Sequence, residues 1–90
     1  MAKTQYRIEY VSEIEHSLKK VPKNILIRIK KAIEERLKTN PKEYGKSLKG
    51  NLAGLRRLRV GDYRIIYRVF EEKVLVLIIA IDDRKSVYDQ

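Results

Sequence analysis

Apolar and polar residues alternate with two different periods along the chain, and each change of period marks the boundary of a predicted element. Residues 6–10 alternate aromatic or aliphatic side chains with charged ones, which is typical of a half-buried strand. Ile14, Leu18 and Val21 are then four and three residues apart, which places them on one side of a helix. The sequence therefore predicts an N-terminal strand followed by a short amphipathic helix that ends at Pro22.

Ser12 and Glu15 have the spacing of a capping box, so we expect them to cap the first helix. A second, longer helix is predicted after the proline. The second helix extends from Lys23 to about Lys38, before Pro41. Its apolar residues recur on one face: Ile25, Leu26, Ile29, Ile33 and Leu37. Two helices joined by a proline turn form an αα-hairpin.

Three further strands are predicted in the second half of the chain. Residues 41–54 hold three of the four glycines and one of the two prolines, so we expect a loop there. The strands are residues 55–60, 63–70 and 74–81. The last is apolar at every position, which is typical of a central strand. The predicted fold is α+β: an N-terminal strand, an αα-hairpin and a three-stranded antiparallel meander, with the helices packed on one face of a twisted antiparallel sheet.

A two-residue turn at Gly61 and Asp62 determines which hairpin residues lie opposite each other. Val60 then pairs with Tyr63, and Arg59 pairs with Arg64. Side chains alternate between the two faces of a strand. One face carries a set suited to a core: Leu58, Val60, Tyr63, Ile65, Tyr67 and Val69. The other face, called the arginine face below, carries Arg57, Arg59, Arg64 and Arg68 together with Ile66 and Phe70.

An arginine directly across from another arginine indicates an anion-binding role. Like charges at paired positions destabilise a sheet by a few tenths to about 1 kcal/mol. A bound phosphate reverses the sign, because guanidinium groups bind phosphate oxygens bidentately. We therefore interpret the arginine face as a phosphate-binding surface on a rigid hairpin. The alternative is a solvated surface whose arginines extend into water or pair with Glu71 and Glu72.

The composition agrees with a polyanion as the partner. Ninety residues are enough for a single domain, residues 1–90. Lysine and arginine number 21 against 12 acids, a net charge of +9, which predicts attraction to nucleic acid or ribosomes. There is no cysteine, which excludes disulfides, thiol catalysis and cysteine zinc sites. No signal peptide or membrane span is apparent, so we expect a cytoplasmic protein that does not bind a membrane.

Few other residues suggest chemistry. His16 is the only histidine, and no serine–histidine pair supports acyl transfer. Asp82 and Asp83 are adjacent, so on an extended chain they point apart, and no third ligand joins them. We therefore expect neither a metal nor a cofactor.

The chain resembles the RelE/ParE superfamily of toxins from toxin–antitoxin pairs. The resemblance covers essentially the whole chain and is carried by "RLRVGDYRIIYRV" and a late R-x-x-x-Y pattern. For the RelE branch it implies an endoribonuclease, an mRNA interferase that cleaves mRNA on the ribosome and inhibits translation. The reaction needs no metal: a 2′-hydroxyl attacks the adjacent phosphate, and basic residues stabilise the charge that develops.

Four residues match the positions that the resemblance implies are catalytic: Arg57, Arg64, Arg84 and Tyr88. Arg64 would contact the scissile phosphate, Arg84 would stabilise it or donate a proton, and Tyr88 would stack on an mRNA base. By itself, Tyr88 is as readily interpreted as a docking residue for the C-terminus. Further RNA contacts are predicted at Lys46, Lys49, Arg56, Arg59, Arg68 and Lys85.

The chain also departs from the family pattern. A second basic position of the family falls on Leu55, which leaves the general base open, and Arg56 or Lys49 are the substitutes nearby. An arginine accepts protons poorly, because its pKa is above about 12. Asp82 and Asp83 add negative charge beside the expected phosphate site.

The resemblance implies partners and leaves two other functions open. A small, acidic cognate antitoxin is expected in every case, along with the ribosome and mRNA. Operator DNA would be reached only through the antitoxin. The alternatives to mRNA cleavage are inhibition of DNA gyrase, as in the ParE branch, and a catalytically inactive RNA-binding protein with the toxin fold.

Overall fold

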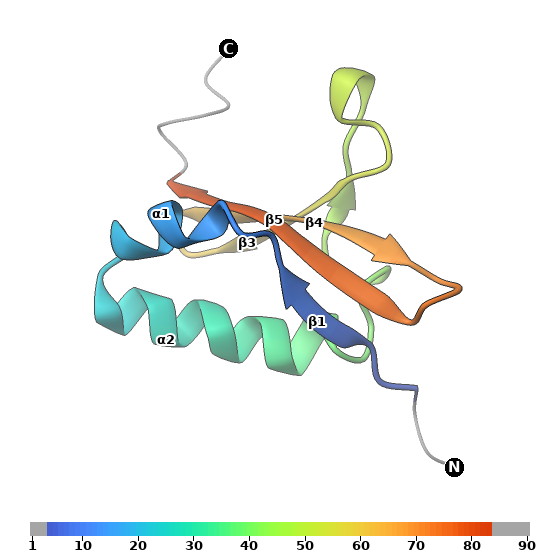
Figure 1. The fold of residues 1–90 in the computed structure, drawn as a ribbon, viewed down its shortest axis with the longest axis horizontal. Helices are drawn as coiled ribbons and strands as arrows, with labels where there is room; N and C mark the ends of the chain where they lie inside the picture. Colours follow the sequence, from blue (N-terminus) through green and yellow to red (C-terminus); the bar gives the residue numbers. More distant parts are fainter. Residues whose placement is uncertain (1–3, 84–90) are drawn as a thin grey trace.

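The computed structural model describes residues 4–83, in which two helices cover one face of a five-stranded sheet (Figure 1). This confirms the predicted α+β class, the αα-hairpin and the C-terminal meander. The elements in chain order are β1 (Arg7–Tyr10), α1 (Ile14–Lys19), α2 (Lys23–Ala32), a π-helical turn (Ile33–Leu37), β2 (Lys46–Ser47), a 3₁₀ turn (Gly50–Leu52), β3 (Arg56–Val60), β4 (Tyr63–Phe70) and β5 (Leu75–Asp83). Among these residues no helix is long and apolar enough to cross a bilayer.

The sheet is mixed, and this differs from the fully antiparallel sheet that we expected. Its strand order is β1-β5-β4-β3-β2. The pairs β4–β5, β3–β4 and β2–β3 are antiparallel, but β1 pairs parallel with β5, from Arg7 opposite Leu75 to Tyr10 opposite Ile78. The αα-hairpin carries the chain away from β1, so β1 can lie in either direction at the sheet edge. A polarity pattern does not encode that direction.

The hairpin register is the predicted one. Val60 lies opposite Tyr63 and Arg59 lies opposite Arg64. On the other side of β4, the register with β5 shifts between Ile66 and Tyr67, so that one residue of β5 has no partner in β4. Such a bulge increases the local twist of the strands.

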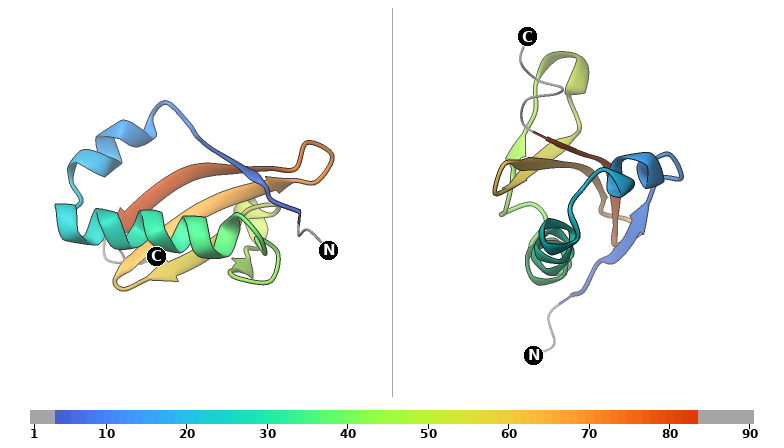
Figure 2. Two further views of the ribbon diagram at one scale, coloured as in Figure 1. Left: turned by 90° about the horizontal axis from the view of Figure 1, so that it is seen from below. Right: turned by 90° about the vertical axis from the view of Figure 1, so that its left-hand side faces the viewer.

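The core lies between the sheet and the helices, and the predicted apolar faces line it. Figure 2 shows α2 across one side of the sheet, while the segment around the 3₁₀ turn rises from the other side. The buried residues come from both layers: Ile14, Val21, Ile29, Ala32, Ile33, Leu37, Leu58, Ile65, Tyr67, Val76, Ile78 and Ile81. Burial of each large aliphatic side chain contributes about 1.5–3 kcal/mol.

Two local predictions were wrong. Ser12 does not cap α1: the helix has no side-chain cap, and the Ser12 hydroxyl donates to Glu13 Oε1 over 3.2 Å. The predicted loop contains the short strand β2 and the 3₁₀ turn. The pairing of β2 with β3 depends on a contact between separate segments of the chain, so the local glycine content does not predict this strand.

Candidate functional site

The arginine face lies on the side of the sheet away from α2, beneath the segment that contains the 3₁₀ turn (Figure 1). Arg57 and Arg64 line a cavity of about 130 Å³ there, together with Leu48, Leu52 and Ile66. The structure therefore brings together two of the predicted catalytic arginines. The leucines of the overlying segment give this cavity an apolar wall, which sequence reasoning did not assign to any site.

The four arginines of this face differ in their exposure to water. Arg64 is 8% exposed, Arg57 is half-buried, and Arg59 and Arg68 are exposed. A guanidinium with little surrounding water interacts more strongly with a phosphate, because the local dielectric constant is lower. Of the four arginines, Arg64 is therefore expected to interact most strongly with a bound phosphate.

Within the described residues, Arg57, Arg59 and Arg68 are not held by neighbouring acids. Within residues 4–83 the ion pairs join Arg7 to Glu9, Lys38 to Glu34 and Lys42 to Glu71, so none of them involves Arg57, Arg59 or Arg68. The guanidinium carbon of Arg68 lies 5.1 Å from the centroid of the Phe70 ring, on the same face. Glu71, which the alternative interpretation paired with an arginine, instead pairs with Lys42. Lys42 holds the pKa of Glu71 below its usual value.

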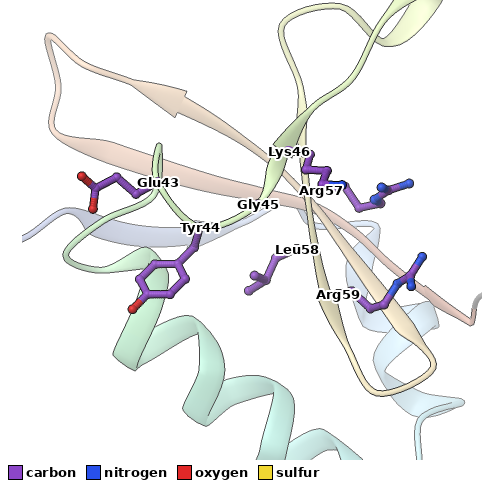
Figure 3. A pocket seen from close by; sticks show the side chains of 7 residues that line it. All are labelled: Glu43, Tyr44, Gly45, Lys46, Arg57, Leu58 and Arg59. Carbon is purple, nitrogen blue, oxygen red and sulfur yellow. The ribbon is translucent and has the colours of Figure 1, made fainter.

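β2 adds a lysine to this cationic surface. Lys46 lies directly opposite Arg57. A second cavity, of about 440 Å³, lies at the outer edge of β3 and is lined by Glu43, Tyr44, Gly45, Lys46, Arg57, Leu58 and Arg59. Figure 3 shows Lys46, Arg57 and Arg59 on one side of β3 and Tyr44 and Leu58 on the other. Arg57 lines both cavities.

Arg56 lies on the opposite, helix-facing side of β3 and holds the segment before β2. Its Nη1 donates to Ser47 Oγ over 2.8 Å, and its Nη2 donates to the carbonyl oxygens of Lys42 (2.7 Å) and Gly45 (3.0 Å). We predicted Arg56 as an RNA contact. The hydrogen bonds to Ser47 and to two carbonyl oxygens give this guanidinium a structural role, and the RNA contact stays a prediction.

Tyr67 holds the same segment from β4. Its hydroxyl donates to the carbonyl oxygen of Pro41 over 2.6 Å and lies 3.3 Å from that of Tyr44. Burial raises the pKa of Tyr67, and the nearby Arg56 partly opposes this shift. Residues 41–47 are thus fixed by Arg56 and Tyr67, which together place Lys46 next to Arg57.

The far end of β5 brings a carboxylate to the arginine face. Asp82 lies directly opposite Arg64 in the β4–β5 ladder, which agrees with the expectation of negative charge beside the phosphate site. Burial raises the pKa of Asp82, and Lys20 opposes this shift. Among residues 4–83 no three histidine, cysteine, aspartate or glutamate side chains gather where they could hold a metal ion.

The remaining predicted residues are less informative. Lys49 is exposed and directly precedes the 3₁₀ turn. Arg84, Lys85 and Tyr88 lie outside the described residues. The last described residue, Asp83, lies opposite Tyr63, the first residue of β4.

Comparisons with known proteins agree with this geometry. Residues 8–88 match the family described as ParE toxin of type II toxin–antitoxin system, parDE. Toxin RelG of Mycobacterium tuberculosis is 31% identical over 83 residues, which is 92% of this chain and 95% of that protein. Toxin RelE of the same organism is 30% identical and is covered to 86% of its length.

Solved structures show the same fold. The toxin–antitoxin complex RelBE2 of M. tuberculosis contains a chain with a TM-score of 0.85 and 30% identity, covering 92% of this chain and 95% of that one. The isolated E. coli RelE toxin has a TM-score of 0.74 at 21% identity, over 92% of this chain and 88% of that one, which is a likeness of fold. The family match and the identity to the M. tuberculosis toxins show that this chain belongs to the RelE/ParE superfamily of type II toxin–antitoxin toxins.

Proposed function

We propose that this toxin is an endoribonuclease that cleaves mRNA on the ribosome and thereby inhibits translation. The observation that carries the proposal is the convergence of Arg57 and Arg64 in one cavity on a cationic face. The similarity to toxins named RelE and RelG supports it.

The arrangement suits phosphodiester cleavage by an internal nucleophile. The 2′-hydroxyl oxygen of one nucleotide loses its proton to water and forms a bond to the adjacent phosphorus. The bond from phosphorus to the 5′-oxygen breaks, and that oxygen takes up a proton from water, which leaves a 2′,3′-cyclic phosphate and a 5′-hydroxyl. Negative charge accumulates on the phosphate oxygens during this step. Arg57 and Arg64 would stabilise that charge through preorganised hydrogen bonds, which is a large catalytic term in many enzymes.

The arginines contribute charge rather than proton transfer. A guanidinium, with a pKa above about 12, does not accept the 2′-hydroxyl proton at neutral pH. The apolar wall of Leu48 and Leu52 limits water at the cavity, which strengthens the interaction of Arg64 with a phosphate. Loss of one such preorganised donor typically lowers kcat by about 10²–10³.

Mapping of cleavage in a translated reporter mRNA tests this proposal. Wild-type protein should produce cuts within the reading frame, and Arg64→Gln or Arg57→Gln should lower the cleavage rate by about 10²-fold or more. Arg28→Gln, on the exposed surface of α2, removes the same charge from the helix-covered side of the sheet and serves as the control. Arg64→Lys retains a cation at the buried position, and unfolding curves for each variant separate loss of chemistry from loss of fold. Intact mRNA in translating ribosomes at stoichiometric wild-type toxin would rule the proposal out.

The proposed partners follow from charge and from the relatives. Solved relatives include complexes of RelE-type toxins with their antitoxins, from M. tuberculosis, E. coli and Methanococcus jannaschii. We propose a small acidic antitoxin for this chain, since its net charge is +9. The ribosome and its mRNA are the proposed targets, and operator DNA would be contacted only through the antitoxin.

Gyrase inhibition is the second candidate, because the matched family is described as ParE toxin. Gyrase-dependent plasmid cleavage that appears only with the toxin, together with uncut mRNA in ribosomes, would support it. Equal growth after induction of wild type and of Arg64→Gln would instead indicate an inactive protein with the toxin fold.

A further inference from the structure

The larger cavity at the outer edge of β3 is not explained by the cleavage site alone. β2 pairs with β3 only at Lys46 and Ser47, opposite Arg57 and Arg56. Among the described residues, therefore, no strand pairs with β3 from Leu58 onward on the edge that faces away from β4. The cavity of about 440 Å³ occupies this position, within the range of about 300–1,000 Å³ that is typical of small-molecule sites.

The two sides of this edge cavity have different chemistry. Lys46, Arg57 and Arg59 approach it from one side of β3 (Figure 3). Side chains at paired positions are about 5 Å apart, and those two residues apart on one strand are about 7 Å apart. Three cations thus lie within reach of one phosphate group. Glu43, the acidic residue of the lining, points away from them in Figure 3.

The other side of the edge cavity presents an aromatic ring. Tyr44 is 41% exposed, and Leu58 lies beside it (Figure 3). The backbone of Tyr44 is held by Tyr67, so the ring is attached to a fixed segment. The guanidinium of Arg36 lies 5.8 Å from the ring centroid. A fixed, partly exposed ring beside a cluster of cations is the combination that single-stranded nucleic acid recognises.

We propose that the edge cavity is a nucleotide subsite for single-stranded RNA, next to the scissile phosphate. Lys46 and Arg59 hold the phosphate of a flanking nucleotide, and its base stacks on Tyr44 across the free edge of β3. Arg57 lines both cavities and so contacts both nucleotides. This inference rests on the proposed function, since it extends the path of the same RNA strand.

Shared use of Arg57 favours RNA over a protein segment as the occupant. A polynucleotide bound at Arg57 and Arg64 must continue beyond Arg57, and the edge cavity is the adjoining space on that side. Stacking on a tyrosine accepts any base, so the subsite adds affinity with little dependence on sequence. The expected gain is about 5- to 100-fold in affinity for the added nucleotide.

Binding of non-cleavable RNA tests the subsite. A series of fluorescein-labelled 2′-O-methyl oligoribonucleotides is lengthened by one nucleotide at a time, at the 5′ end or at the 3′ end. Each oligoribonucleotide is titrated with the protein at low salt. One added nucleotide at one end should tighten binding by about 5- to 100-fold in wild type and in Tyr44→Phe, but not in Tyr44→Ala. Tyr10→Ala removes an equally exposed tyrosine from the opposite sheet edge and should keep the gain. Lys46→Gln and Arg59→Gln should reduce both the gain and its salt dependence.

Photocrosslinking gives a second, independent measurement on the ribosome. An mRNA with 5-iodouridine beside the scissile phosphate should crosslink to Tyr44 in programmed ribosomes. An unchanged gain in Tyr44→Ala, or crosslinks only to other residues, would overturn the subsite. Binding of an acidic peptide, but not RNA, that is lost in Tyr44→Ala would overturn it as well and identify a protein site. Cleavage that depends on Arg64 without any length-dependent gain would remove the subsite while leaving the proposed function intact.

Discussion

Replacement of Gly45 by alanine should destabilise the protein much more than the same change at Gly54. Gly45 has a φ of +84°, and an added Cβ would lie 2.9 Å from the carbonyl oxygen of Arg57 and closer still to the Tyr67 hydroxyl. Gly54 has a φ of +93°, but no atom lies within 4 Å of its added Cβ. Gly54→Ala therefore changes only the backbone preference, at about 1–2 kcal/mol. The comparison isolates the steric contact.

The expected magnitude at Gly45 has two contributions. The left-handed backbone costs about 1–2 kcal/mol for a residue with a Cβ. Displacement of the Tyr67 hydroxyl weakens its hydrogen bond to the carbonyl oxygen of the buried Pro41, which costs about 1–2 kcal/mol. Gly45→Ala should thus lower the free energy of unfolding by about 2–4 kcal/mol. At this chain length the change corresponds to a fall in Tm of about 8 °C or more.

A double-mutant cycle makes this reasoning refutable. Tyr67→Phe removes the hydroxyl and should cost about 1–2 kcal/mol alone, because the ring stays packed. In Gly45→Ala/Tyr67→Phe the methyl group no longer meets the hydroxyl, so the double variant should be less destabilised than the sum by about 1 kcal/mol. Urea unfolding followed by circular dichroism measures all four proteins. Strict additivity, or a Gly45→Ala variant as stable as Gly54→Ala, would contradict the proposed contact.

Three further changes have expected outcomes. Burial raises the pKa of Asp82, so its carboxylate opposes folding above the folded-state pKa, and stability rises as the pH falls through that pKa. Asp82→Asn should therefore raise Tm at neutral pH and tighten RNA binding near Arg64. Unchanged Tm and unchanged RNA affinity would contradict this expectation. Lys42 lowers the pKa of Glu71, so the ion pair stabilises the fold above the pKa that Glu71 has in the unfolded chain, and this effect is lost as the pH falls through the folded-state pKa. Glu71→Gln should therefore flatten the acid limb of a curve of Tm against pH. A curve identical to that of wild type would argue against the ion pair. Arg68→Gln should reduce the slope of log K against log salt for single-stranded RNA by about 0.7, and an unchanged slope would show that Arg68 contacts no phosphate.

Sequence reasoning succeeded where neighbouring residues carry the information. The two-residue turn at Gly61 and Asp62 determined the β3–β4 register, because the turn type leaves one pairing that keeps the apolar side chains on a single face. The same alternation predicts Arg57 and Arg64 on one face of the sheet. Helix periodicity placed α2 in the same way.

It failed where the decisive contact joins distant parts of the chain. The strand pattern does not show that the guanidinium of Arg56 reaches the carbonyl oxygens of Lys42 and Gly45. The parallel pairing of β1 and the apolar wall formed by Leu48 and Leu52 have the same origin. Local propensity does not contain these contacts.

The sequence by itself thus determined the class of fold, the pairing of the central hairpin and the cationic side of the sheet, because turn chemistry and period-two alternation act between adjacent residues. The tertiary structure decided which cations share a cavity, how deeply Arg64 is buried, and how the free edge of β3 is formed. These depend on where β2 docks, and that position is set by hydrogen bonds from Arg56 and Tyr67 to a segment more than ten residues away along the chain.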